Sequence, residues 1–360
     1  RPLLADADWV AKAREGRAER INTCIACNQA CLDNIFENRR ATCLVNPRAC
    51  NETELVIRPA ATKKRIAVIG AGPAGLACAT TLGERGHAVT LFEQSSGIGG
   101  QFNMAKRIPG KEEFHESLRY YAVRLRETGV EVRLGTHATA AMLRDGFDEI
   151  VIACGITPRV VAMPGIDHPK VMSYVDLLLG GRAAGKRVAI VGAGGIGFDV
   201  AEFLVQSPPS PTTDVARWTH EWGIDTTLEA QSGLVRAAPE PPDREVWLLQ
   251  RTAGRPGARL NKTTGWVHRL TLKAKNVAML GGVEYERIDD EGLHIRIDGK
   301  PQLLPADDIV ICAGQEPNRA LHAELDAAGL KTHLIGGADV AAELDAKRAI
   351  DQGTRLAAAL

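Results

Sequence analysis

Apolar residues along the chain form short runs typical of buried strands, and these runs alternate with helical stretches. Two units share the order strand, glycine turn, helix, strand; these elements lie at 64–69, 75–85 and 88–93, and again at 187–191, 196–205 and 245–250. Each unit closes with a similar buried strand that runs into a glycine turn, at 148–155 and 307–314. This repetition predicts an α/β fold with two nested Rossmann-like, doubly wound dinucleotide-binding units.

The segments outside these units have weaker patterns. Residues 1–22 are predicted as a polar helix with Trp9 and Val10 on a thin apolar face, and a final helix is predicted over roughly 342–360. Between Val205 and Arg244 lies a long proline-rich excursion, and its prolines argue against a helix or a central strand. We expect the excursion to pack on the surface.

Composition excludes several classes of protein. The chain has 360 residues, with 44 Lys and Arg against 44 Asp and Glu, so no net charge attracts nucleic acid or an anionic membrane. No apolar stretch reaches the roughly 18 uninterrupted residues that span a bilayer. Because no secretory signal is present, we expect a reducing, cytoplasmic setting.

The first glycine turn has the spacing of a dinucleotide-binding motif. Gly70, Gly72 and Gly75 follow a strand and precede a helix, so backbone N–H groups at the helix start are placed to bind a pyrophosphate. Glu93 ends the next strand about twenty residues later, where an acid is expected to bind ribose hydroxyls. A structural turn without a ligand is the alternative.

Gly192, Gly194 and Gly197 repeat this pattern. Here the second strand is followed by Arg251, a cation in place of the acid, and a guanidinium suits a 2′-phosphate. We therefore predict that the second unit binds NADPH; the alternative is an exposed arginine without a ligand. The first unit is then the FAD candidate, because the glycine-rich loop 96–101 follows Glu93 and can run along an extended cofactor.

Five of the eight cysteines lie between positions 24 and 50. Cys24, Cys27, Cys31 and Cys43 have a spacing of three close ligands and one distant ligand, which favours a [4Fe–4S] cluster. A structural zinc site is the alternative, and Cys50 could replace Cys43 as the fourth ligand. The three remaining cysteines lie singly in apolar segments and are interpreted as small core residues.

Several motifs together resemble bacterial NADPH-dependent 2,4-dienoyl-CoA reductases, of the wider old yellow enzyme and trimethylamine dehydrogenase class. The resemblance covers the whole chain and rests on segments 22–33, 43–48, 100–103, 262–266, 313–318 and 343–346. In that family an FMN-binding barrel precedes the cluster, so this chain resembles the C-terminal, electron-supplying part. Residues 1–6 resemble the last turn of the barrel, where Arg1 would meet the FMN phosphate.

The resemblance also implies a reaction and further contacts. NADPH would pass a hydride to FAD, and single electrons would then reach FMN through the cluster and reduce 2,4-dienoyl-CoA in fatty-acid β-oxidation. The proton donor would lie in the barrel, so no catalytic residue is predicted here and the chain alone would act as an NADPH diaphorase. Related flavoproteins place an Asp on the ribityl chain where this sequence has Gly337, and Asp339 is the expected substitute. The implied FAD contacts are Gly70, Gly72, Ala74, Gly75, Glu93, Gly100, Gln101, Ala138, Gly337, Asp339, Arg348 and Ala349, and Lys262 joins the NADPH contacts.

These inferences divide the chain into five parts, namely 1–22 (barrel end and linker), 23–60 (cluster), 61–165 (FAD), 166–312 (NADPH) and 313–360 (FAD). Three other functions stay open: a non-catalytic electron-transfer or assembly module, a zinc-stapled scaffold, and a reductase of another unsaturated or amine substrate. A disulphide reductase is disfavoured because neither glycine unit contains a close cysteine pair. His268 is interpreted as a surface residue on a loop. Oligomeric state is left open.

Overall fold

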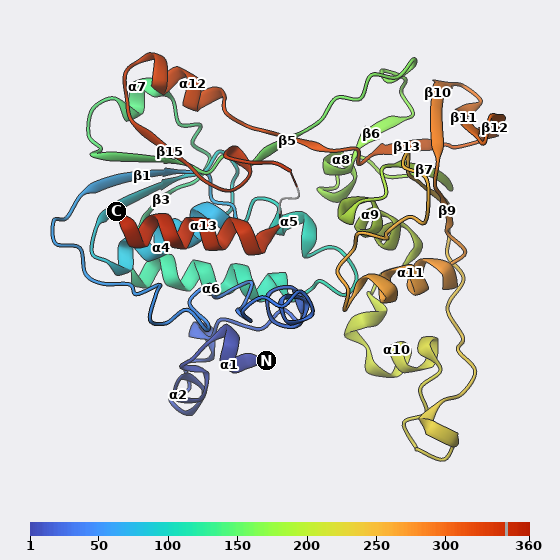
Figure 1. Ribbon diagram of the computed structural model, residues 1–360, viewed down its shortest axis with the longest axis horizontal. Helices are drawn as coiled ribbons and strands as arrows, with labels where there is room; N and C mark the ends of the chain where they lie inside the picture. The colour runs from blue at the N-terminus through green and yellow to red at the C-terminus, as the bar shows by residue number, and fades with distance from the viewer. Residues whose placement is uncertain (343–344) are drawn as a thin grey trace. The chain divides into compact units, whose positions relative to one another are not determined.

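The computed structural model describes residues 1–342 and 345–360 (Figure 1). Glu343 and Leu344, which belong to one of the family-like motifs, lie outside the described residues. The chain forms two compact units. The first comprises Arg1–Asn103, Glu113–Thr157 and Gln315–Leu360, and the second comprises Met104–Glu112 and Pro158–Gly314. Both contain a parallel sheet, which confirms the predicted α/β fold class.

The first unit is built on a five-stranded parallel sheet of order β15-β4-β1-β2-β3. Its strands are β1 (Arg65–Ile69), β2 (Ala88–Phe92), β3 (Glu131–Arg133), β4 (Glu149–Ile152) and β15 (Thr332–Leu334). Three helices, α4 (Pro73–Glu84), α6 (Phe114–Glu127) and α13 (Ala346–Ala359), lie together on one face (Figure 1). Helices α7 (Ala140–Leu143) and α12 (Ala320–Ala327) lie on the other face.

The second unit contains a five-stranded parallel sheet of order β6-β13-β7-β8-β9. Its strands are β6 (Val171–Ser173), β7 (Arg187–Val191), β8 (Glu245–Leu249), β9 (Ala278–Leu280) and β13 (Asp308–Ile311). Helices α8 (Tyr174–Leu178), α9 (Gly195–Val205) and α11 (Gly265–Ala274) belong to this unit. An antiparallel sheet of β10 (Val283–Asp289), β11 (Gly292–Ile297) and β12 (Lys300–Leu304) contributes to the core on the other face.

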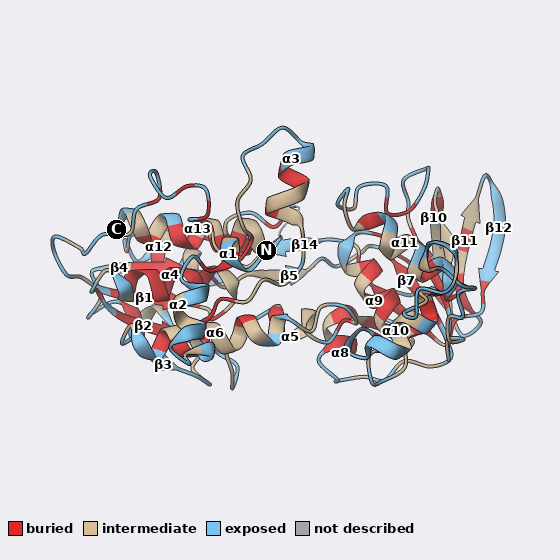
Figure 2. Cartoon of the chain, turned by 90° about the horizontal axis from the view of Figure 1, so that it is seen from below, coloured by how far each residue is buried: buried red, intermediate tan, exposed pale blue. Residues whose placement is uncertain are grey.

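Shorter elements complete the chain. They are α1 (Pro2–Ala5), α2 (Trp9–Arg14), η1 (Ala18–Arg20), the π-helical turn η2 (Gln29–Asp33), α3 (Asn34–Phe36), α5 (Phe102–Ala105), η3 (Pro211–Thr213), α10 (Val215–Trp222), η4 (Gln231–Gly233), η5 (Gly336–Ala338) and the paired strands β5 (Ile156–Pro158) and β14 (Gln315–Pro317). Buried residues follow the strands and the inner helices of each unit (Figure 2). No described helix is both long and apolar enough to span a membrane.

The strand and helix positions predicted for both glycine units are confirmed to within a few residues. The predicted helix over 1–22 is wrong: the segment breaks into α1, α2 and η1. The physical reason is Asp6, a buried carboxylate that accepts hydrogen bonds from the backbone N–H groups of Asp8 and Asn22 and pairs with Lys12 at 2.6 Å. A side chain that binds backbone groups in this way competes with helical hydrogen bonding.

The final helix begins later than predicted because Asp345 caps it, accepting from the N–H of Arg348.

The excursion between Val205 and Arg244 contains a helix, contrary to the expectation. Helix α10 occupies a proline-free stretch; Asp214 caps its start, and it ends at Gly223, whose φ is +67°. The buried Glu221 of α10 accepts a 2.7 Å hydrogen bond from the Nζ atom of Lys275. This buried ion pair attaches the excursion to the end of α11.

Candidate dinucleotide and metal sites

The first glycine turn lies where the strand order of its sheet reverses, between β1 and β4. Ligands of open parallel sheets bind at this position. Gly70 has φ +105°, and a Cβ there would lie 2.5 Å from the carbonyl oxygen of Ala153. A Cβ on Gly75 would lie 1.9 Å from the carbonyl oxygen of Gly70. A Cβ on Gly72 would meet one atom, at 4.0 Å, so the middle position leaves room for a phosphate to approach the backbone.

Glu93 is buried at the end of β2. One carboxylate oxygen accepts from the N–H of Ala71 and the other from the N–H of Ser95, each at 2.8 Å. Glu93 is thereby held against the glycine turn, as a ribose-binding acid requires. Its carbonyl oxygen accepts from the N–H of Thr136, which brings the predicted contact Ala138 to the same edge of the sheet.

The other predicted FAD contacts converge on this turn. The loop containing Gly100 and Gln101 is joined to it by a 2.7 Å hydrogen bond from Gly99 N–H to the carbonyl of Ala71, and a Cβ on Gly100 would lie 2.9 Å from the Cα of Gly72. Gly337 is buried in η5. Ala349 is buried on α13, and the Arg348 guanidinium donates to the backbone carbonyls of residues 340 and 342. A Cβ on Gly336, next to Gly337, would lie 2.8 Å from the Cβ of Ala74 and 3.9 Å from the Cβ of Ala349, so η5 and α13 adjoin the start of α4.

The second turn repeats the geometry. It lies between β7 and β13, again where the strand order reverses. Gly192 has φ +115°, and a Cβ there would lie 2.7 Å from the carbonyl oxygen of Cys312. A Cβ on Gly197 would lie 1.9 Å from the carbonyl oxygen of Gly192, while one on Gly194 would meet nothing within 4 Å. Both turns thus leave the middle glycine open and pack the third glycine against the first.

Arg251 is exposed directly after β8, at the edge where the second turn lies, and Lys262 is exposed in the turn before α11.

The sequence suggested that His268 lies on a surface loop, but it lies on α11. Its Nδ1 is 2.7 Å from Oε1 of the buried Glu202 on α9. Burial raises the pKa of Glu202, although His268 opposes the shift. Burial works to lower the pKa of His268, but the hydrogen bond and charge of Glu202 raise it overall. An acid on the apolar face of α9 is the sequence signal that was available for this pair.

The four predicted metal ligands are brought together. Cys24, Cys27, Cys31 and Cys43 are all half-buried free thiols and line one cavity of about 220 Å³, with Arg1, Leu4, Ile25, Ala26, Asn28, Ala30, Leu44 and Val45. Cys50 is exposed and does not line it. Arg1 donates a 2.8 Å hydrogen bond from its guanidinium to Asn28 Oδ1, beside the same cavity.

The cavity holds thiols that are costly to ionise alone. Burial raises the pKa of Cys27 to about 12; the N–H of Gln29 opposes the shift, and the other three cysteines add to it. Burial also raises the pKa of Cys43, opposed by the N–H groups of Val45 and Asn46. These backbone donors are placed to stabilise thiolate sulfur once a cation compensates the burial.

Four thiols on one cavity are a donor set that two kinds of metal centre use, a [4Fe–4S] cluster and a structural zinc ion. Among the described residues, no three of the four Sγ atoms all lie within 4.8 Å of one another. A zinc ion bound at about 2.3 Å by four thiolates brings the sulfurs to about 3.8 Å from each other. In a four-iron cluster each sulfur binds a different iron, so the sulfurs lie further apart. The four thiols therefore fit a [4Fe–4S] cluster as ligands, and without metal they do not have the close sulfur spacing of a formed zinc site.

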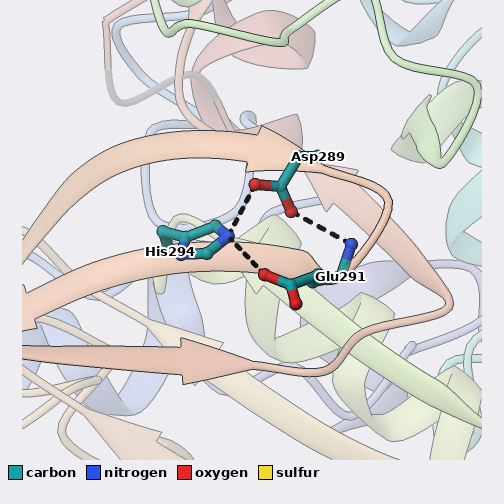
Figure 3. A group of neighbouring side chains, drawn as sticks. All are labelled: Asp289, Glu291 and His294. Atoms are coloured by element: carbon teal, nitrogen blue, oxygen red, sulfur yellow. Dashed lines mark hydrogen bonds and ion pairs between the residues drawn. The ribbon is translucent and has the colours of Figure 1, made fainter.

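The other set is Asp289, Glu291 and His294, in the hairpin that joins β10 to β11 (Figure 3). Asp289 Oδ2 is 2.8 Å from His294 Nε2 and 3.1 Å from the Nε of Arg287, and Oδ1 accepts from the N–H of Glu291. The 2.8 Å contact with His294 Nε2 is the main cause that lowers the pKa of Asp289. Since cationic and backbone donors already satisfy Asp289, we assign this group to the stability of the hairpin.

The chain is similar to several known reductases. The chain is 32% identical over 343 residues to a metal reductase of Desulforamulus reducens, which covers 94% of this chain and 50% of that protein. It is 26% identical over 349 residues to a cinnamate reductase of Clostridium sporogenes, covering 94% and 46%. The solved structure of a 2-naphthoyl-CoA reductase complex matches with a TM-score of 0.85 at 29% identity, over 100% of this chain and 50% of that chain. The chain thus spans about half the length of these relatives.

Residues 64–348 match the family model described as pyridine nucleotide-disulphide oxidoreductase. The name refers to disulphide chemistry, but Cys154 follows β4 in the first unit and Cys312 follows β13 in the second. The match therefore concerns the two-nucleotide fold. The chain belongs to the pyridine nucleotide-disulphide oxidoreductase family and is a flavin-dependent pyridine nucleotide oxidoreductase.

Proposed function

We propose that this chain supplies electrons from NADPH to a further flavin domain. In this proposal the first unit binds FAD, the second binds NADPH, and the four cysteines hold a [4Fe–4S] cluster. The gathering of the four cysteines around one cavity is the observation that supports the proposal most directly. When bound, the flavin accepts hydride and the cluster transfers single electrons.

The residues of the chain contribute binding and orientation. The open N-terminus of α4 at Gly72 is placed to bind the FAD pyrophosphate, and Glu93 is placed to accept from ribose hydroxyls. The open N-terminus of α9 at Gly194 serves the NADPH pyrophosphate, and Arg251 serves its 2′-phosphate. The backbone N–H groups of Gln29, Val45 and Asn46 are placed to donate to the sulfurs of Cys27 and Cys43 and so to support thiolate ligation.

For the whole protein we propose the reduction of a conjugated acyl thioester, with 2,4-dienoyl-CoA as the first candidate. A preceding FMN barrel, met by Arg1, would then contact the substrate. A different unsaturated acid or thioester is the second candidate, because the similar proteins include a cinnamate reductase and a 2-naphthoyl-CoA reductase.

The decisive experiment is an analysis of iron, acid-labile sulfide, zinc and flavin in anaerobically purified protein. We expect about four irons and four sulfides per chain with one FAD. NADPH should bleach the flavin absorbance and drive the reduction of an artificial dye. Zinc in place of iron, or thiols without metal, would overturn the cluster; colourless protein would indicate a scaffold. Bound flavin that NADPH does not reduce would indicate a module without turnover.

A further inference from the structure

The amide of Gln352 bridges two parts of the turn that follows β15. Its Oε1 accepts a 2.8 Å hydrogen bond from the backbone N–H of Gly336, and its Nε2 donates a 2.7 Å hydrogen bond to Asp339 Oδ2. Gln352 lies on α13, sixteen residues after Gly336 and thirteen after Asp339. No motif in the sequence pointed to this residue.

The two bonds determine which way the amide faces. A backbone N–H only donates, so the oxygen of Gln352 faces Gly336 and the NH₂ group faces the carboxylate. The bond from Gln352 Nε2 uses Oδ2 of Asp339, and no other residue in the described parts of the chain bonds to that carboxylate. Oδ1 is therefore left to accept a hydrogen bond from a ligand.

The bridge lies beside the first phosphate-binding helix. A Cβ on Gly336 would lie 2.8 Å from the Cβ of Ala74, and a Cβ on Gly353 would lie 2.3 Å from the carbonyl oxygen of Ala74. Ala74 is the second residue of α4. Asp339 and Gln352 thus lie next to the helix start that we propose binds the FAD pyrophosphate.

Two arginines also hold the backbone of this turn. Arg319 donates to the carbonyl oxygens of Ala338 and Asp339, and Arg348 donates to those of Val340 and Ala342. Beyond its bond with the N–H of Gly336, Gln352 therefore contributes the contact to the Asp339 side chain.

From this geometry we infer that Gln352 is a positioning residue of the flavin site, which orients the Asp339 carboxylate so that its free oxygen accepts from a hydroxyl of the bound dinucleotide. The hydroxyl belongs to the ribityl chain or to the ribose, since both offer the same donor. The inference rests on the proposed binding of FAD by the first unit. The sequence suggested Asp339 as the residue that binds the ribityl chain, and the inference adds Gln352 as the residue that orients it.

Gln352→Glu is the informative substitution. It keeps the shape of the side chain and the acceptor for Gly336 N–H, but it places a second carboxyl against Asp339. Two carboxyl groups in hydrogen-bond contact share a proton at low pH and repel when both ionise. The charged neighbours already have other partners. Arg319 and Arg348 donate to backbone carbonyls, Asp345 accepts from the N–H of Arg348, and Asp351 accepts from the side chain of Arg355. None of them therefore replaces the NH₂ group of Gln352 as a donor to Asp339.

The measurement is the dissociation constant of FAD, by calorimetric titration of flavin-free full-length chain. For Gln352→Glu we expect a loss of affinity of about tenfold or more as the pH rises from about 5.5 to 8.5, with little change in the unsubstituted protein. Gln352→Ala should lose affinity by a factor that is the same at both pH values. Asp351→Asn is the matched control on the same helix and should behave as the unsubstituted protein.

A parallel pH dependence in Gln352→Glu and the unsubstituted protein would overturn the inference, as would an unchanged affinity in Gln352→Ala. Circular dichroism of each variant shows whether the chain remains folded. If the unsubstituted chain binds no FAD at either pH, the proposed function of the first unit fails instead. The two failures are therefore distinguishable.

Discussion

At the scale of single residues, Gly75 shows how closely the first nucleotide turn is packed. An added methyl group there would lie 1.9 Å from the carbonyl oxygen of Gly70, which is backbone and has no side chain to rotate away. We expect Gly75→Ala to lower the free energy of unfolding by about 1–3 kcal/mol, the usual cost of overpacking, and to reduce the amount of bound flavin. Urea unfolding and absorbance spectroscopy measure the two effects.

Gly97 provides the matched control. A Cβ there would meet nothing within 4 Å, and its φ lies outside the left-handed region. Gly97→Ala should therefore retain the stability of the unsubstituted protein. If Gly75→Ala behaves like this control, the close approach of the third glycine to the first has been overestimated.

A second prediction at this scale concerns the exposed Arg251 after β8. If its guanidinium binds the 2′-phosphate, Arg251→Ala should raise the KM for NADPH by about tenfold or more, because a charge-assisted hydrogen bond is lost. The KM for NADH should stay the same. Steady-state dye reduction with each nucleotide measures both values.

The exposed Arg236, in the excursion, offers a comparison with the same change of charge. Arg236→Ala should leave both KM values unaltered. An equal rise in the KM values for NADPH and NADH in Arg251→Ala would contradict a role specific to the 2′-phosphate.

At the scale of elements, α9 and α11 are joined by the 2.7 Å contact between Glu202 and His268. A second pair, Lys111 with Asp199 at 2.6 Å, binds α9 one turn earlier. Folding raises the pKa of His268 above its ordinary value of about 6.5. The charge of His268 therefore stabilises the folded protein fully at pH values below about 6.5. This stabilisation is lost as the pH rises through the folded pKa. The raised pKa of Glu202 acts in the same direction, because the folded state holds the proton more tightly.

We therefore expect His268→Gln, which keeps a donor without the charge, to destabilise the protein most near pH 6. The loss there should be about 1.5–3 kcal/mol, typical of a hydrogen bond to a charged group, and it should shrink towards pH 9. Urea unfolding at several pH values tests this. The exposed His115, replaced in the same way, is the control. A loss that grows as the pH rises would reverse the assigned sign.

At the scale of the whole molecule, the cysteine cavity and the two nucleotide sites are built from different parts of the chain. The cavity is lined by residues between positions 1 and 45, whereas the glycine turns begin at Gly70 and Gly192. We expect Cys43→Ser to lose iron and sulfide while it keeps FAD and its reduction by NADPH. Metal analysis and anaerobic absorbance spectra distinguish these outcomes.

Cys50→Ser is the matched control because Cys50 is exposed outside the cavity. It should retain iron, sulfide and flavin alike. The opposite result, loss of iron in Cys50→Ser and its retention in Cys43→Ser, would make Cys50 the fourth ligand.

The amino-acid sequence by itself determined the features that depend on neighbouring residues. Strand β7 and helix α9 lie where the apolar pattern placed them, and the glycines after β1 and β7 form the expected turns. The spacing of the first three cysteines also predicted that they gather. Such features follow from backbone freedom and short-range periodicity, which a sequence records directly.

Only the tertiary structure decided the features that join distant residues. Asp6 breaks the predicted first helix because it accepts from the N–H of Asn22. His268 was expected on a surface loop, but it contacts the buried Glu202 across two helices. The bridge from Gln352 to Asp339 likewise requires α13 to pack on the turn after β15. Each of these polar groups has a hydrogen-bond partner that is distant in the sequence. A polar group that is removed from water needs such a partner, but the local sequence does not show which residue it is.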